Sequence, residues 1–255
     1  LLALLIELAY GIAIKKNTYR LNDAISNLFM GTLRTANKLI IIGAAGYVFY
    51  IVETKFALWR MDATSAFTWI FAFVIYDFFY YWFHRISHER QIFWASHAAH
   101  HQSEDYNLST ALRQTGTGAF VSWVFYIPMF VIGIPSYIFV SVASLNLIYQ
   151  FWVHSEHIPK LGWYENYFVT ASNHRVHHAQ NEQYIDKNYG GVFIIWDRMF
   201  GTHKVEDENE ACIYGMRSTL NTFNPVWANL HVYVKIVKEM WLSRDWKDKL
   251  YAPFA

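Results

Sequence analysis

The chain has 255 residues, a net charge of +1 and one cysteine, with 54% hydrophobic and 19% aromatic residues. This length suits one domain, and such an aromatic content is common near membrane interfaces. The near-zero charge without a dense basic stripe argues against a nucleic-acid partner, and a single cysteine excludes an internal disulfide or a thiolate cluster.

The first 83 residues alternate between apolar and polar stretches. Residues 1–14 resemble the end of a membrane helix, and because they begin inside an apolar run we expect a missing upstream segment. Residues 15–38 predict a polar connector with five basic residues and one acid. Residues 39–52 are apolar but too short for a ~30 Å hydrocarbon core, whereas residues 66–83 are long enough to span it.

Residues 116–153 carry no charge and are interrupted at Gly133-Ile134-Pro135. This pattern predicts a helical hairpin with a tight turn, so that the chain crosses and returns to the side from which it came. If residues 39–52 and 66–83 form another such pair, the basic connector lies on the same side, and its excess of Lys and Arg indicates the cytoplasm. Beyond the hairpin, residues 192–196 predict a short buried strand or helix. Residues 226–241 predict a helix in the plane of the membrane interface.

Histidines are concentrated in the polar segments between these apolar stretches. Ten of the twelve fall in four short segments, while the other two, His203 and His231, stand alone. Residues three and four apart share one face of a helix, so each segment can direct two or three imidazoles to one point. Neutral imidazole binds iron, zinc, copper and nickel, and eight or more imidazoles exceed what one metal uses. We therefore expect a two-metal site. The candidate ligands are His84, His88, His97, His100, His101, His154, His174, His177 and His178.

A few further polar residues are candidates for the site. His157 is open between a metal ligand, a hydrogen-bond partner of a ligand and a surface residue. Glu89 and Asp197 are candidate catalytic residues that could orient an imidazole or touch a cosubstrate, with a solvated acid as the alternative for each. Asp77 lies inside an apolar span, where charges tend to face the protein interior, so a structural hydrogen-bond network is at least as well supported as catalysis.

The size of the imidazole set bears on which metal it holds. Catalytic zinc uses three protein ligands and one metal, and structural zinc uses four. We expect two iron ions, with zinc as a substitute in purified protein. Two irons can activate O₂ and oxidise an unactivated C–H bond. Lipid chains carry such bonds, and this site lies at the mouth of a predicted membrane bundle.

Four motifs extend this interpretation: HHQSEDYNLSTALRQ at residues 100–114, HRVHH at 174–178, YIDKNYGG at 184–191 and IWDRMFGT at 195–202. The stretch from about residue 66 to residue 202 resembles the fatty acid hydroxylase superfamily of integral membrane di-iron enzymes, which includes sterol desaturases and C-4 sterol methyl oxidases. Within it, the motifs are most similar to the alkylglycerol monooxygenase branch.

The resemblance implies an all-α integral membrane bundle with a cytoplasmic, histidine-rich cap that holds a dimetal centre. We expect one such domain over residues 1–255, with its core at residues 66–202. The resemblance also implies oxidation of a lipid C–H bond by O₂ and an external reductant, with ligand roles for the nine candidate histidines. In the alkylglycerol branch, hydroxylation beside an ether oxygen gives a hemiacetal that breaks down to an aldehyde, and tetrahydrobiopterin donates the electrons. His157 departs from that branch.

Two other functions compete with this one. A sterol or fatty-acid desaturase or hydroxylase would use the same dimetal site. A metal transporter, or a membrane protein with structural zinc, belongs to a different class. A transporter should carry ionisable ligands in the middle of its spans, whereas these histidines cluster at span ends and in polar segments. The pattern therefore favours the enzyme.

Overall fold

The computed structural model describes residues 1–255, and its regular secondary structure is helical. Two isolated β-bridges, Phe168 with Phe193 and Ala179 with Tyr214, are its only β structure. The predicted all-α class is therefore confirmed. Two helices, α2 (Leu21–Lys55) and α3 (Ala66–Glu89), are long and apolar enough to cross a membrane, and α1 (Leu2–Ala13) is a shorter apolar helix.

Helix α2 corrects one expectation from the sequence. Residues 15–38 are not a separate connector, because residues 21–38 continue into residues 39–52 as one helix of 35 residues. No proline interrupts this stretch. Its buried positions near the start, Asp23, Ser26, Asn27 and Met30, follow helical spacing but are mostly polar. The apolar side chains face outward instead, which is why a search for apolar stretches missed this half of the helix.

The predicted hairpin of residues 116–153 is confirmed. Its first arm is broken into α5 (Gly118–Val121), η3 (Ser122–Tyr126) and α6 (Ile127–Ile132), and its second arm is α7 (Ser136–Trp152). Gly133 ends α6 in a left-handed conformation with φ of 98°. The largest hydrophobic core lies where the hairpin packs on α3. Its fully buried members are Ala72, Tyr76, Tyr126, Met129, Phe130, Ile134, Ile138 and Val142.

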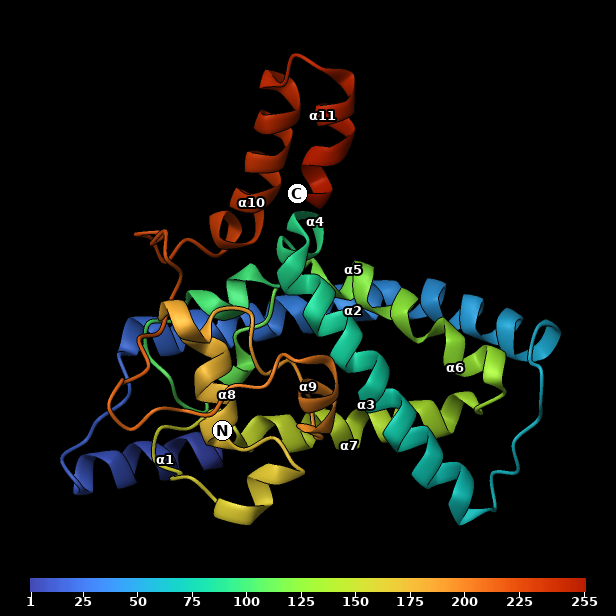
Figure 1. Cartoon of the computed structure of the whole chain (residues 1–255), viewed down its shortest axis with the longest axis horizontal. Coiled ribbons are helices and arrows are strands. Elements are labelled where there is room, and N and C mark those ends of the chain that lie inside the picture. The colour runs from blue at the N-terminus through green and yellow to red at the C-terminus, as the bar shows by residue number, and fades with distance from the viewer.

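The turn of this hairpin contacts the connection between α2 and α3. The backbone N–H of Leu58 donates to the carbonyl of Val131 (2.8 Å), and that of Met61 donates to the carbonyl of Gly133 (3.3 Å). Both connections lie together at one end of the molecule (Figure 1). The histidine segments follow the other ends of α3 and α7, so the hairpin returns the chain to the side of the clusters as predicted.

The remaining elements form a cap around the histidine segments and a C-terminal pair of helices. The cap contains α4 (Gln91–Trp94), η1 (Ala98–Gln102), η2 (Thr110–Leu112), η4 (Gly162–Asn166), α8 (Ala171–His178), η5 (Glu182–Tyr184) and α9 (Ile195–Phe200). Residues 192–196, predicted to be a short buried strand or helix, contain the bridge residue Phe193 and the first two residues of α9.

The helix predicted at residues 226–241 is confirmed as α10 (Pro225–Leu242), followed by α11 (Trp246–Tyr251) and η6 (Ala252–Phe254). Val232 and Ile236 of α10 pack against Ala95 and Ala98 of the cap. The α10–α11 pair crosses the direction of α2 (Figure 1). It is also held to α4, because the side chain of Gln91 donates to Glu239 (3.1 Å) and the backbone N–H of Gln91 donates to the carbonyl of Ala255 (3.3 Å). Its placement in the plane of a membrane interface stays a prediction.

Gly133 provides a test of the contact between the two connections. A Cβ atom at this residue would lie 1.9 Å from the carbonyl oxygen of Trp59, and φ of 98° is unfavourable for any other residue. We expect Gly133→Ala to lower the free energy of unfolding by at least ~1–2 kcal/mol, since the left-handed backbone alone costs about that much. Thermal unfolding in detergent measures the effect. Gly46→Ala is the control, because Gly46 lies within α2 with open space around it and should gain up to about 1 kcal/mol. Equal stability of the two variants would contradict the packing described here.

Candidate metal centre

All nine candidate histidines come together in two groups. Within each group the potential ligand nitrogens lie within 4.8 Å of one another. The five-histidine group consists of His84, His88, His97, His101 and His177. The four-histidine group consists of His100, His154, His174 and His178. The groups adjoin, because the rings of His101 and His178 stack with centroids 4.3 Å apart.

The nitrogen spacing within each group fits a metal ion. The Nε2 atom of His97 lies 3.1 Å from Nε2 of both His84 and His101. In the other group, Nε2 of His154 lies 3.4 Å from that of His100 and 2.9 Å from that of His174. Two nitrogens that each lie ~2.1 Å from one ion, at angles of about 90–109°, are separated by roughly 3.0–3.4 Å. The imidazoles are therefore already arranged as ligands of two ions.

Helix α8 shows how a short element supplies ligands to both groups. Its eight residues begin with a capping box, in which the side chains of Thr170 and Asn173 each accept a hydrogen bond from the other's backbone N–H. A helix turns about 100° per residue, so His178 lies ~40° to one side of His174 and His177 lies ~60° to the other. His177 accordingly joins the five-histidine group, and His174 and His178 join the other.

Backbone carbonyls fix the tautomer of four of these histidines. A carbonyl oxygen only accepts, so the ring Nδ1 that faces it carries the proton and Nε2 is left free to bind a metal. These contacts are 2.7–3.0 Å long. They join His84 to Tyr189, His100 to Arg113, His154 to Gln150 and His177 to Lys187.

Three imidazoles of the two groups, one of them His177, have an Nε2 atom that is buried without a hydrogen-bond partner. The other two are His88 and His178. A buried polar atom in this state costs about 1–3 kcal/mol, which a bound metal ion would offset. These unpartnered atoms belong to the two groups, so the residues present fit a pair of metal ions.

Burial keeps the imidazoles in the neutral form that binds metals. It lowers the pKa of His154 to about 4, despite the hydrogen bond to the Gln150 carbonyl, which acts in the opposite direction. Burial, and then the neighbouring imidazoles, also lower the pKa of other members well below the usual value. These are His97, His101, His174, His177 and His178. These imidazoles are therefore favoured in the neutral form, which leaves one nitrogen of each ring free to bind a metal.

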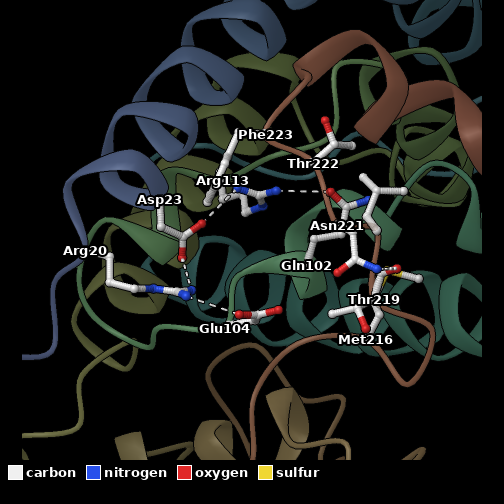
Figure 2. Close-up of a pocket in the computed structure, with 11 residues that line it drawn as sticks. Arg20, Asp23, Gln102, Glu104, Arg113, Met216, Thr219, Asn221, Thr222 and Phe223 are labelled. Atoms are coloured by element: carbon white, nitrogen blue, oxygen red, sulfur yellow. Dashed lines mark hydrogen bonds and ion pairs between the residues drawn. The ribbon is translucent and has the colours of Figure 1, made fainter.

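Arg113 connects the four-histidine group to α2. Its carbonyl accepts from His100, and its buried guanidinium donates to the carbonyl of Ala99 (2.6 Å) and to the side chain of Asn27 (3.0 Å). The same guanidinium forms an ion pair with buried Asp23 at 3.4 Å. A cavity of about 240 Å³ opens on the outer side of this pair (Figure 2). Arg113 thus lies between the cavity and the candidate ligand His100.

Asp77 anchors the loop at residues 190–193 rather than binding at the centre. Its carboxylate accepts from the backbone N–H groups of Val192 (2.8 Å) and Phe193 (2.9 Å), and from the side chains of Trp196 and Asn146. Of the two roles that the sequence left open for Asp77, these contacts form the buried hydrogen-bond network. A Cβ atom on Gly191 would lie 2.7 Å from the same carboxylate, which explains a glycine at that position.

The two acids proposed as catalytic, Glu89 and Asp197, lie outside both histidine groups. Glu89 accepts from the guanidinium of Arg85 at 2.8 Å on the surface of α3. Asp197 is fully buried and accepts from the backbone N–H groups of Tyr189 (2.7 Å) and Gly190 (2.8 Å). A catalytic role for either stays a prediction, and the contacts of Asp197 indicate support of the backbone that holds His84.

His157 also lies outside the two groups. Its ring packs edge-on against Tyr10 of α1, with centroids 5.3 Å apart, and both of its nitrogens are buried without partners.

The carbonyls that orient the ligands, and the buried ion pair of Arg113, were not found from the sequence. Backbone groups leave no residue-type signal, and one arginine in a polar loop has many ordinary explanations.

The Arg113–Asp23 pair supports a second prediction. Removing one partner of a buried ion pair leaves an uncompensated charge and costs about 3–5 kcal/mol. We expect Arg113→Met to lower the unfolding free energy by about that amount and to weaken metal binding by the four-histidine group. Lys160→Met is the matched control, because Lys160 pairs with Glu208 at 3.1 Å on the surface and should lose at most ~1 kcal/mol. Denaturant titration of the metal-free protein compares the two, and similar losses would show that burial of the pair is not decisive.

Comparison with known proteins agrees with this geometry. The chain is 42% identical over 254 residues to human alkylglycerol monooxygenase, covering 98% of this chain and 56% of that protein. It is 36% identical over 238 residues to alkylglycerol monooxygenase of Caenorhabditis elegans, covering 93% and 47%. An ornithine lipid hydroxylase of Rhizobium tropici is 28% identical over 149 residues, or 56% of this chain and 44% of that protein. No solved structure matches the chain.

The chain spans about half the length of the curated relatives it matches. The profile of the fatty acid hydroxylase family matches residues 69–202, a stretch that contains all nine histidines of the two groups. Because this match covers more than half of the 255 residues, the chain belongs to the fatty acid hydroxylase family.

Proposed function

We propose that this chain is the core of a membrane di-iron monooxygenase that uses O₂ to hydroxylate a C–H bond of a lipid. The observation that carries the proposal is the meeting of nine neutral imidazoles in two adjoining groups at the ends of apolar helices. Two iron ions bound there would supply the oxidising chemistry that an unactivated C–H bond requires. Each of the nine histidines in the two groups is proposed as an iron ligand.

The chain's own residues prepare the centre for this chemistry. Backbone carbonyls hold four imidazoles with Nε2 directed inward, so that little rearrangement is needed when metal binds. Burial of the groups excludes water, which limits side reactions of a strong oxidant. We propose that the electrons come from an external donor.

We propose an ether lipid of the alkylglycerol class as the substrate and tetrahydrobiopterin as the donor. Hydroxylation beside the ether oxygen would give a hemiacetal, which collapses to an aldehyde and an alcohol. The similarity to alkylglycerol monooxygenases over 98% of the chain supports this choice. The alternative is a sterol or fatty-acid hydroxylase or desaturase, supported by 26% identity to human lathosterol oxidase over 50% of the chain.

We also propose that residues 1–255 act as one domain whose metal centre faces the cytoplasm. Basic residues that precede and begin α2 are joined to the cap. Lys16 pairs with Glu156 at 3.3 Å, and Arg20 pairs with Asp105 at 2.9 Å. An excess of Lys and Arg marks the cytoplasmic side of membrane proteins, so the cap is expected on that side.

His101 provides a direct test of the metal role. It belongs to the five-histidine group and stacks on His178 of the other group. We expect His101→Ala to lower turnover by more than the ~10–100-fold typical of residues that only orient a ligand, and to reduce the iron content per chain. The melting temperature of the metal-free protein should change little, because the helices pack through other residues. His231→Ala, on the outside of α10, should keep full activity and iron. Retained iron and turnover in His101→Ala would refute the proposed centre.

The substrate proposal makes a separate prediction. Protein in detergent, loaded with Fe²⁺ and supplied with tetrahydrobiopterin and O₂, should convert an alkylglycerol to a fatty aldehyde and glycerol. A sterol and a free fatty acid, offered under the same conditions, should remain unchanged. Mass spectrometry of the products decides between them. Oxidation of the sterol or fatty acid without cleavage of the ether would establish the alternative, and tightly bound zinc without any turnover would favour a structural metal site.

A further inference from the structure

A short loop at residues 186–189 holds part of the five-histidine group from outside. The carbonyl of Lys187 accepts from Nδ1 of His177 (3.0 Å), and the carbonyl of Tyr189 accepts from Nδ1 of His84 (2.8 Å). Two alternate carbonyls of one short segment therefore fix two ligands that belong to different helices. We call residues 186–189 the holding loop.

The first residue of the holding loop faces a third member of the group. An oxygen of Asp186 lies 3.8 Å from Nδ1 of His88, and the two side chains are 50% and 9% exposed. Nε2 of His88 is buried without a hydrogen-bond partner, and His88 is a member of the five-histidine group. An imidazole that gives Nε2 to a metal carries its proton on Nδ1 and needs an acceptor there. The half-exposed carboxylate of Asp186 can close the distance by a small side-chain rotation.

The backbone of the holding loop has an unusual conformation and is firmly anchored. Asp186 and Asn188 have φ of 57° and 56°, a left-handed conformation that is uncommon for residues other than glycine, although Asn and Asp adopt it more readily than most. Residues persist in such conformations where the surroundings over-determine them. The buried side chain of Asn188 donates to the carbonyls of Asn173 (3.0 Å) and Lys204 (2.7 Å) and accepts from the N–H of Lys204. These bonds keep the flanking carbonyls directed at the histidines.

Asp197 supports the end of the loop from the opposite side. One carboxylate oxygen accepts from the N–H of Tyr189 and from the hydroxyl of Thr202, both at 2.7 Å, and the other accepts from the N–H of Gly190. The Thr202 hydroxyl also lies 3.0 Å from the hydroxyl of Tyr81 on α3. The loop is thus fixed to α9 and to α3, the helix that carries both His84 and His88.

We propose that Asp186 is a positioning residue, whose carboxylate accepts the Nδ1 proton of His88 and thereby directs Nε2 to the metal of the five-histidine group. The inference rests on the proposed function, since it requires a metal in that group. No carboxylate plays this part in the four-histidine group, where His100 and His154 donate to backbone carbonyls. The two metals are therefore held unequally, and Asp186 stabilises only one of them.

The test removes the carboxylate without disturbing the loop. Glycine adopts a φ near +57° freely, so Asp186→Gly keeps the backbone and deletes the side chain, while Asp186→Asn keeps an acceptor oxygen and removes the charge. Lys15→Gly is the matched control, because Lys15 has φ of 58° in an exposed turn after α1. Metal-free full-length chain in detergent is titrated with Co²⁺ against a competing chelator, which resolves the two metal affinities.

We expect Asp186→Gly to weaken one of the two metals by about 10–100-fold, with an intermediate loss in Asp186→Asn and none in Lys15→Gly. The second affinity and the melting temperature of the metal-free protein should match the wild type. Two unchanged affinities in Asp186→Gly would overturn the inference alone. A parallel loss of both metals and of the melting temperature would also overturn it, because it would show a general structural role. A wild-type chain that fails to bind two metals would overturn the proposed function, and this inference with it.

Discussion

The constraint on which the rest of the structure depends is the burial of nine imidazoles in one small volume. Each ring has two polar nitrogens, and each nitrogen needs a partner once water is excluded. Outward-facing nitrogens obtain theirs from backbone carbonyls in four of the rings. The nearest pairs of ligand nitrogens lie 2.9–3.4 Å apart, a spacing suited to a shared ion. In these four rings, backbone carbonyls bind the outward-facing nitrogen, and a metal ion would bind the inward-facing one.

Helix packing brings the ligand segments to one place. The hairpin of α6 and α7 reverses at Gly133 and contacts the α2–α3 connection, so the opposite ends of α3 and α7 meet. His84 lies near the end of α3 and His154 follows α7, which places one ligand of each group beside the hairpin. The hydrophobic core between these helices reaches the centre at Tyr80, which packs against the core and whose ring centroid lies 5.3 Å from that of His84. Apolar packing sets the position of the centre, and hydrogen bonds set the orientation of its imidazoles.

The sequence was most informative where a pattern repeats. Helical spacing indicated eight of the nine histidines of the two groups, the position directly after the hairpin indicated His154, and the interruption at Gly133 located the hairpin turn. It failed for the first half of α2, because a helix whose apolar side faces outward has its polar residues inside. Which histidine belongs to which group could not be predicted either. That division depends on how α8 and η1 are rotated against each other, and tertiary packing rather than local spacing decides it.

The division of ligands has a further physical consequence. Helix α8 gives His177 to one group and His174 to the other, and the segment at η1 gives His101 to the first and His100 to the second. A shift of either segment would therefore disturb both metals together. Supports that act on one group alone must come from outside these two segments. The holding loop is such a support for the five-histidine group, whereas Arg113, which accepts from His100 and is bound to α2, supports the other. If two metals bind as proposed, the shared segments would couple them, while separate outer supports would allow their affinities to differ.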